Sequence, residues 1–187
     1  LSEARQHITH SISEVFPDAP IYTSLYNSEN KLLQENFKSE HSSSSNKKII
    51  TSFLQKIPFV KRYHYFFPLL MPLAVEQFDF SEVDIVISIS SSFAKGVITK
   101  PQTRHICYCL TPPRFLWDDS HKLTEGFGFP KIIKKLLPPF ISYLRIWDYQ
   151  AAARTTEFIA ISDFVRERIK KYYQREAAVV YPPVNVN

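Results

Sequence analysis

The sequence predicts an α/β fold, namely a Rossmann-like parallel sheet flanked by helices. Apolar runs with the length of strands lie at 83–89, 104–109 and 157–161. Helical patterns separate these runs, and strands that alternate with helices are typical of βαβ units with parallel strands. The chain has 187 residues, enough for one domain with a substantial core. We therefore expect 1–187 to form a single, partial Rossmann-like domain, half of a doubly wound fold.

The first 75 residues mix helical and strand patterns. Apolar residues at helical spacing predict a helix over 1–16, and the strand IYTSLY follows at 21–26. The polar, serine-rich segment 38–48 predicts a mobile surface loop. Short helical pieces interrupted by prolines, with many aromatic residues, are expected over 49–75.

The second half of the chain alternates more regularly. A turn into a helix is predicted over 90–99, between the first two apolar runs. A long helical region is predicted around 129–154, with a break at its two adjacent prolines. Ser162 is expected to cap the helix that follows the third run, and AAVVY at 177–181 predicts a fourth strand.

Composition and charge limit the function classes. Hydrophobic residues make up 44% and charged residues 22%, as in globular proteins, and the net charge of +5 mildly favours anionic partners. The basic residues are scattered without a known module pattern, so nucleic acid is not an expected partner. No signal-peptide pattern opens the chain, and the apolar stretch 65–75 is too short to span a bilayer. A cytoplasmic location is expected.

Cys107 and Cys109 share one face of a predicted strand. Their Cα atoms would lie ~6.5 Å apart, at the upper limit for a disulfide, so no bridge is expected. His105 shares that face, but the three positions span ~13 Å of strand and cannot all reach one zinc ion. A buried strand face is predicted, and no metal site.

Polar clusters follow three of the predicted strands. They are Ser90–Ser92, Thr111–Arg114 and Ser162–Asp163. In parallel α/β sheets, ligands bind beyond the carboxyl ends of the strands, where helix N-termini present unpaired N–H groups. Helix caps and strand-ending prolines would explain each cluster alone, and the coincidence of three favours a ligand edge. The three glycines form neither a G-x-G-x-x-G motif nor a P-loop, and no G-x-S-x-G elbow is present.

Six segments in order resemble one enzyme family. They are FPDAPIYTSLY at 16–26, VDIVISISSSFAKGVIT at 83–99, HICYCLTPPRFLWDD at 105–119, YLRIWDYQAAAR at 143–154, FIAISDFVRERIKKYY at 158–173 and VVYPPV at 179–184. The chain resembles the amino-terminal domain of glycogen-synthase-like retaining glycosyltransferases of the GT-B fold. Bacterial mannosyltransferases that build surface polysaccharides such as lipopolysaccharide are especially similar. The resemblance runs from about Phe16 to the end.

The resemblance implies transfer of a mannose-like sugar from a nucleotide-diphospho-sugar to a lipid-linked or polysaccharide acceptor, with no other cofactor. It implies that this domain binds the acceptor, while a second Rossmann domain holds most of the nucleotide-sugar donor. SEAR at 2–5 resembles the start of the helix after the family's first strand, and the final VVYPPVNVN resembles the start of the interdomain linker. We therefore expect the chain to be inactive alone, with that first strand and the second domain outside it.

The resemblance also places the acceptor at the predicted ligand edge. The implied acceptor-binding residues are Ser90, Ser91, Ser92, Lys95, Thr111, Arg114, Trp117 and Asp118, and Ser162 is implied to face the interdomain cleft. Within this set we assign Arg114 to a phosphate or sugar hydroxyls, Trp117 to the apolar face of a sugar, and Asp118 to a hydroxyl. Relatives often carry a histidine where this chain has Leu110, so no catalytic residue is assigned.

The alternative is a non-catalytic membrane-surface or protein-interaction module. In KIIKKLL at 131–137, Lys131, Lys134 and Lys135 share one helical face and the apolar residues share the other. This pattern is typical of a helix lying on anionic lipid. An amphipathic helix with its apolar side in the core explains it equally well. The two functions are compatible, because family acceptors are often lipid-linked, and peripheral contact with the inner membrane face is then expected.

Overall fold

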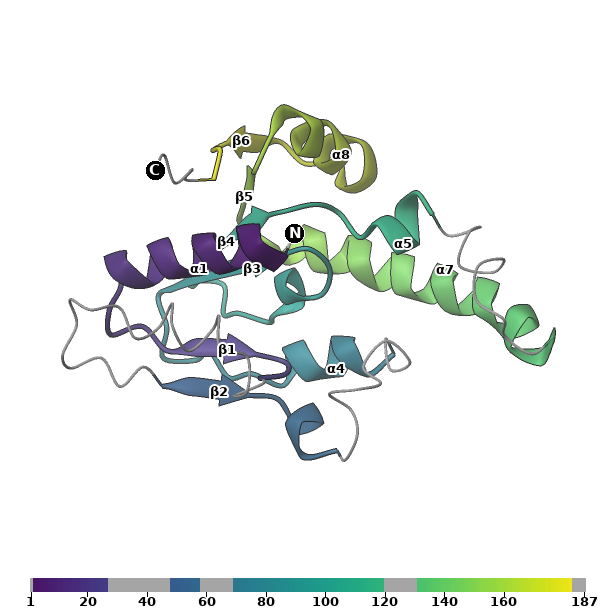
Figure 1. Cartoon of the computed structure of the whole chain (residues 1–187), viewed down its shortest axis with the longest axis horizontal. Helices are drawn as coiled ribbons and strands as arrows, with labels where there is room; N and C mark the ends of the chain where they lie inside the picture. The colour runs from purple at the N-terminus through teal and green to yellow at the C-terminus, as the bar shows by residue number, and fades with distance from the viewer. Residues whose placement is uncertain (1, 27–47, 58–68, 120–130, 183–187) are drawn as a thin grey trace. The chain divides into compact units, whose positions relative to one another are not determined.

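The mixed α/β fold is confirmed by the computed structural model, in which every described strand pairs in parallel (Figure 1). The structure describes residues 2–26, 48–57, 69–119 and 131–182. The contacts divide the chain into two compact units, Leu1–Asp79 with Pro182–Asn187, and Phe80–Tyr181. The single-domain organisation stays a prediction. Apart from Lys48, the serine-rich segment 38–48 lies outside the described residues.

The first unit contains a small parallel sheet. After helix α1 (Ser2–Val15), strand β1 (Ile21–Thr23) pairs with β2 (Ile49–Thr51). The prediction of helical pieces from residue 49 is wrong for β2, which is formed entirely by β-branched residues; these side chains favour extended backbone. A 3₁₀ turn, η1 (Phe53–Lys56), and helix α4 (Leu70–Glu76) follow.

A small core joins the last two elements of this unit. Leu54 of η1 and Ala74 of α4 are fully buried. The half-buried residues around them are Leu25, Ile57, Leu70 and Met71. Ser52 caps η1 by accepting a hydrogen bond from the Leu54 N–H, and its hydroxyl donates to the Ser24 carbonyl at 2.7 Å. This bond fastens the turn to the segment that follows β1.

The second unit is built on a four-stranded parallel sheet. Its strands are β3 (Ile85–Ser90), β4 (Arg104–Cys109), β5 (Glu157–Ala160) and β6 (Ala177–Val179). All four strands are confirmed at the positions that the sequence predicted. They lie side by side in chain order, so each strand is added next to its predecessor.

The connection from β3 to β4 differs from the prediction. The helix expected over 90–99 is only a 3₁₀ turn, η3 (Ala94–Gly96). Gly96 and the three β-branched residues after it have weak helix propensity, and a proline follows at position 101. The chain instead bends back after one turn, which brings Lys95 into the interior of the unit.

The described part of the second unit also contains three α-helices. They are α5 (Arg114–Trp117), α7 (Lys131–Arg154) and α8 (Asp163–Tyr173). The predicted break in α7 is wrong, because the helix continues through Pro138 and Pro139. Both prolines are exposed, so the carbonyls that lose their helical partner can bond to water.

Helices α7 and α8 cover one face of the sheet. The buried cluster on this face joins Cys107, Cys109, Phe158 and Ala160 of the strands to Ala152 of α7 and to Val165, Ile169 and Tyr173 of α8. Both cysteines are buried and free, as predicted.

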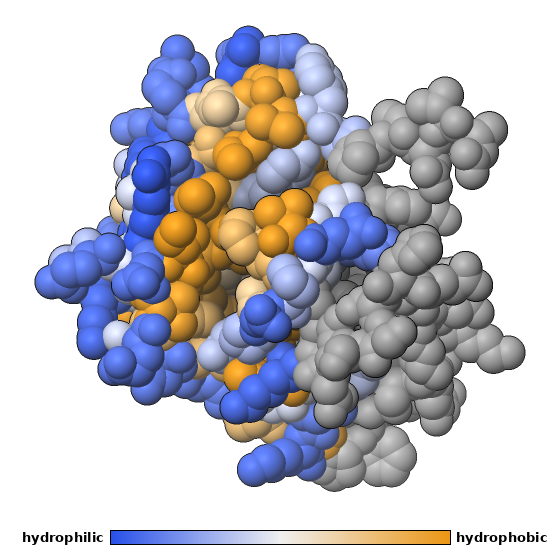
Figure 2. All heavy atoms as spheres, turned by 90° about the vertical axis from the view of Figure 1, so that its left-hand side faces the viewer, coloured by the Kyte–Doolittle hydropathy of each residue, from blue (hydrophilic) through white to orange (hydrophobic). Residues whose placement is uncertain are grey.

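Other apolar side chains remain on the surface. Figure 2 shows one face of the molecule where hydrophobic atoms gather between hydrophilic ones. On the face of the four-stranded sheet that α7 and α8 do not cover, Ile85 and Ile87 of the edge strand β3 are exposed.

Candidate functional site

The three predicted polar clusters follow neighbouring strand ends. In the sheet, Ser90 is paired with Cys109, and Cys109 with Ala160. Strands β3, β4 and β5 are parallel, so the segments that follow them leave the sheet at the same edge. The edge on which the sequence places a ligand therefore exists, with helices α5 and α8 beginning beside it.

The loop after β3 is shaped by its own polar groups. Ser90 is buried, and its hydroxyl accepts a hydrogen bond from the Lys95 N–H at 3.3 Å. The Lys95 ammonium donates to the Ser92 carbonyl at 2.7 Å. Ser91 and Ser92 are half-buried at the rim of this loop. Two members of the serine cluster, Ser90 and Ser92, thus hold the loop after β3 in shape through their hydrogen bonds with the buried Lys95.

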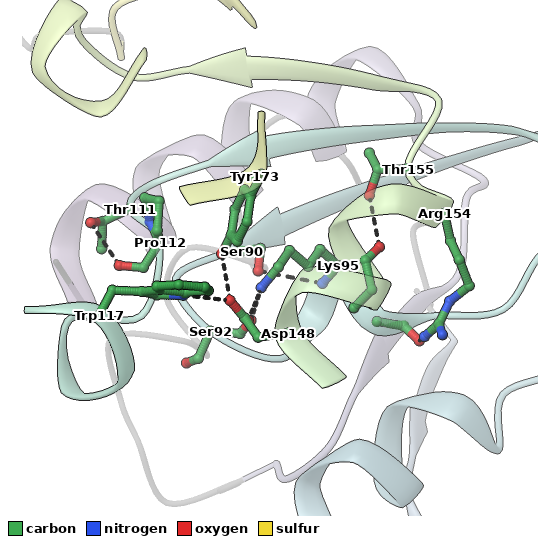
Figure 3. Close-up of polar contacts among 12 residues, drawn as sticks. Ser90, Ser92, Lys95, Thr111, Pro112, Trp117, Asp148, Arg154, Thr155 and Tyr173 are labelled. Carbon is green, nitrogen blue, oxygen red and sulfur yellow. Dashed lines mark hydrogen bonds and ion pairs between the residues drawn. The ribbon is translucent and has the colours of Figure 1, made fainter. Parts of the chain in front are cut away.

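Lys95 and Asp148 form a buried ion pair at the centre of the unit. Figure 3 shows Lys95, Trp117 and Tyr173 pointing toward Asp148. Oδ1 of Asp148 accepts from Lys95, while Oδ2 accepts from the Trp117 indole at 2.9 Å and from the Tyr173 hydroxyl at 2.8 Å. The carboxylate therefore joins the β3 loop, α5, α7 and α8.

The sequence interpretation missed Asp148, although a signal for it exists. Ile141, Leu144 and Ala151 are buried on one side of α7, and Asp148 continues their helical spacing. A carboxylate among core positions needs a buried cation and further hydrogen-bond donors. Burial, followed by the neighbouring Asp148 carboxylate, raises the pKa of Tyr173 well above its ordinary value, so the phenol stays a donor.

Trp117 packs against the protein's own aromatic rings. Its ring stacks on Tyr172 with centroids 5.0 Å apart and lies edge-on to Tyr173 at 6.3 Å. With its indole N–H bonded to Asp148, Trp117 connects the ligand edge to the buried ion pair. The role assigned to it under a sugar stays a prediction.

Asp118 is held by α8. Its carboxylate accepts hydrogen bonds from Arg168 and from the Tyr172 hydroxyl. Partial burial raises the pKa of Asp118, but the bonds from Tyr172 and Arg168 outweigh it, so the pKa lies below its usual value. Arg168 also donates to the Pro112 carbonyl at 3.0 Å, which fastens α8 to the segment that follows β4. The sequence interpretation did not single out Arg168.

Arg114 lies at an open hollow. Its side chain is 64% exposed, and its Nη2 lies 3.4 Å from Oδ2 of Asp119. The hollow has a volume of about 550 Å³ and lies between α5 and α8. It is lined by Arg114, Asp118, Phe164, Glu167, Arg168, Lys171 and Tyr172. Of the predicted acceptor-binding residues, the structure brings Arg114 and Asp118 together here.

The remaining predicted residues have separate positions. The Thr111 hydroxyl donates to the Pro112 carbonyl at 3.0 Å. Ser162 caps α8, as predicted, by accepting from the Val165 N–H at 3.3 Å. Lys135 is exposed on α7, whereas the side chains of Lys131 and Lys134 lie outside the described part of the structure.

The described residues contain neither a metal-binding cluster nor a membrane-spanning helix. No group of three or more His, Cys, Asp or Glu side chains in this part of the chain is arranged to hold a metal ion. No helix there is long and apolar enough to cross a membrane. Comparison with models of protein families, with curated proteins and with solved structures found no match.

Proposed function

We propose that this chain is the acceptor-binding, amino-terminal domain of a retaining glycosyltransferase of the GT-B fold. The enzyme would move a mannose-like sugar from a nucleotide-diphospho-sugar to a lipid-linked or polysaccharide acceptor. The observation that carries the proposal is the meeting of three polar strand ends at one edge of a parallel sheet. This is the edge at which α/β proteins bind their ligands, and three of the six segments that resemble the family, 83–99, 105–119 and 158–173, supply the residues that follow these strand ends.

The roles of the edge residues follow from their surroundings. Arg114 is exposed in the first turn of α5, and its planar fork matches a phosphate or a pair of hydroxyls. Lys95, Asp148 and Trp117 act from behind this edge, because their contacts hold the β3 loop and α5 in place. The acceptor would therefore bind to a preformed surface of this domain, and the donor would be held mainly by a second domain.

The proposal predicts a preference for acceptors over donors. The purified chain should bind short-chain prenyl-diphosphate-linked sugars more tightly than nucleotide-diphospho-sugars in calorimetric titrations. When both are supplied, mass spectrometry should show no multiple turnovers. Arg114→Lys should weaken acceptor binding by about tenfold, because lysine lacks the bidentate fork.

Arg104→Lys is the matched control for this experiment. Arg104 is 58% exposed, close to the value for Arg114, but it lies at the opposite end of β4 in a pair with Glu157. Tighter binding of nucleotide-sugars, repeated transfer by this chain alone, or equal losses in the two arginine variants would contradict the proposed function.

A surface stripe on α7 favours contact with a membrane as a second function. Lys135 is exposed, and Tyr143, Ile146 and Tyr149 are exposed further along the same side of the helix. Together with the exposed Pro139, these residues are spaced three or four positions apart, which places them along one side of the helix. Basic residues beside exposed aromatic and aliphatic ones are typical of helices that lie on anionic lipid.

Membrane contact predicts that the lysines of α7 are needed for vesicle binding. A triple substitution of Lys131, Lys134 and Lys135 by Glu should abolish co-sedimentation with phosphatidylglycerol vesicles at low salt, because each lysine adds about 1 kcal/mol near such a surface. The control changes the exposed Lys48, Lys56 and Lys100 to Glu, which alters net charge equally. Equal binding by both variants would remove this second function.

A further inference from the structure

We propose that the hollow between α5 and α8 binds a sugar phosphate, with the phosphate at Arg114 and Lys171 and the sugar ring against Phe164. The inference rests on the proposed function, because it names the part of a lipid-linked acceptor that this domain would hold. It adds α8 to the binding surface, whereas the sequence places the acceptor only on the segments after β3 and β4.

The two outer cations of the hollow are available to an anion. Lys171 is exposed, and its ammonium lies 5.6 Å from the centroid of the Tyr172 ring. Among the described residues, no carboxylate lies within ion-pairing distance of it. Arg114 has Asp119 as a partner at 3.4 Å, but exposed pairs of this kind contribute only about 0–1 kcal/mol. A phosphate can therefore bind here without breaking a strong ion pair.

Arg168 supplies a fixed positive charge at the base of the hollow. It is 8% exposed and is held by Asp118 and by the Pro112 carbonyl. Its guanidinium carbon lies 5.7 Å from the Phe164 ring centroid and 5.3 Å from that of Tyr172. Its Nε is buried and has no hydrogen-bond partner among the described residues. Two carboxylates line the hollow, those of Asp118 and Glu167. The first of them, Asp118, is already paired with Arg168.

Phe164 and Glu167 indicate that the anion carries a sugar. Phe164 is 71% exposed at the start of α8, with Arg168 near its ring. An aromatic ring in such a hollow matches the apolar C–H face of a pyranose, and a carboxylate beside it accepts hydrogen bonds from hydroxyls. Glu167 is exposed on α8 three residues after Phe164, and both side chains line the hollow. Inorganic phosphate alone would leave both Phe164 and Glu167 without a ligand contact.

The test compares three soluble probes with the whole chain. α-Mannose 1-phosphate, mannose and inorganic phosphate are titrated into ¹⁵N-labelled protein and followed by NMR. We expect the sugar phosphate to bind at least about tenfold more tightly than either half, because it uses both the cations and the ring. The shifted amides should lie in α5 and α8. Equal affinity for the sugar phosphate and inorganic phosphate, or binding only to phosphatidylglycerol vesicles, would overturn the proposal.

Two variants separate the parts of the site. Lys171→Glu should weaken binding of the sugar phosphate by about tenfold or more, through loss of a cation and gain of a like charge. Phe164→Ser should weaken the sugar phosphate but leave inorganic phosphate unchanged. Both positions are exposed, and thermal unfolding checks that each variant is folded. Lys170→Glu is the control, because Lys170 is also exposed but pairs with Glu176 at 3.1 Å and does not line the hollow.

The outcomes distinguish this inference from the proposed function. If Lys171→Glu and Phe164→Ser bind a prenyl-diphosphate-linked sugar as well as the unchanged chain does, the hollow is not its site and the proposed function stands. If α-mannose 1-phosphate binds the hollow but no lipid-linked acceptor binds the chain, the inference stands and the proposed function fails. Equal losses in Lys170→Glu and Lys171→Glu would overturn the assignment to the hollow.

Discussion

Asp148→Ala is expected to lower the free energy of unfolding by about 3–5 kcal/mol, because it leaves a charged lysine unpaired in the interior. Lys95 is 1% exposed, so water cannot replace the lost carboxylate. The same substitution removes the acceptor of the Trp117 and Tyr173 hydrogen bonds. Urea unfolding followed by far-UV circular dichroism measures the loss. Asp84→Ala, at an exposed carboxylate, is the control and should change stability little.

A double-substitution cycle separates the ion pair from the other hydrogen bonds. Asp148→Asn keeps an oxygen acceptor but leaves Lys95 without a counter-charge, and Lys95→Met leaves Asp148 without its cation. Together they leave no buried charge, so the double variant should be more stable than the sum of the two single losses predicts. Strict additivity would show that the pair contributes no coupling energy.

The second large effect is a loss of stability between about pH 6.5 and pH 4. His105 is fully buried, and its Nε2 lies 2.8 Å from the Ser88 hydroxyl. Burial, and then the charge of Arg154, lower its pKa from 6.5 to about 4. In this window the unfolded chain binds the proton and the folded chain does not. The stabilisation is therefore complete above pH 6.5 and is lost as the pH falls toward 4, by about 3 kcal/mol in total.

Urea unfolding at about pH 7.5 and about pH 4.5 tests this dependence. His105→Gln should flatten it, because glutamine does not titrate. The lowered pKa of Asp118 acts in a different window, since its contribution is present above the unfolded value of 3.8 and is lost only below it. An unchanged slope in His105→Gln would assign the acid sensitivity to other groups.

Local patterns in the sequence were sufficient to predict the four strands of the large sheet and the cap of α8. Strands such as Ile85–Ser90 and Arg104–Cys109 are short segments rich in β-branched, aromatic and other apolar residues, and the Ser162 cap depends only on its neighbours. β2 was missed because a three-residue strand exists only through its pairing with β1, which lies far away in the sequence. The continuity of α7 through two prolines was missed because it depends on their exposure to water.

The candidate site was predictable at the level of the sheet edge but not of single side chains. Strand periodicity places Ser90, Thr111 and Ser162 at one edge without knowledge of packing. It does not show that Lys95 points inward, because that depends on a carboxylate 53 residues later in the chain. The hollow was missed for the same reason, since Arg114 and Lys171 come together only when α5 and α8 pack against the same core.

The strands of the large sheet pair in the same order in which the ribosome releases them, because their order in the sheet is their order in the sequence. Each strand of β3–β4–β5–β6 can dock on the one already made, so the sheet grows in one direction as the chain emerges. Lys95 is released 53 residues before Asp148, a delay of roughly 3 to 11 s at ordinary elongation rates. During that time the β3 loop has no counter-ion with which to enter the interior. The β3 loop can therefore take up its packed arrangement around Lys95 only after the part of α7 that carries Asp148 has been synthesised.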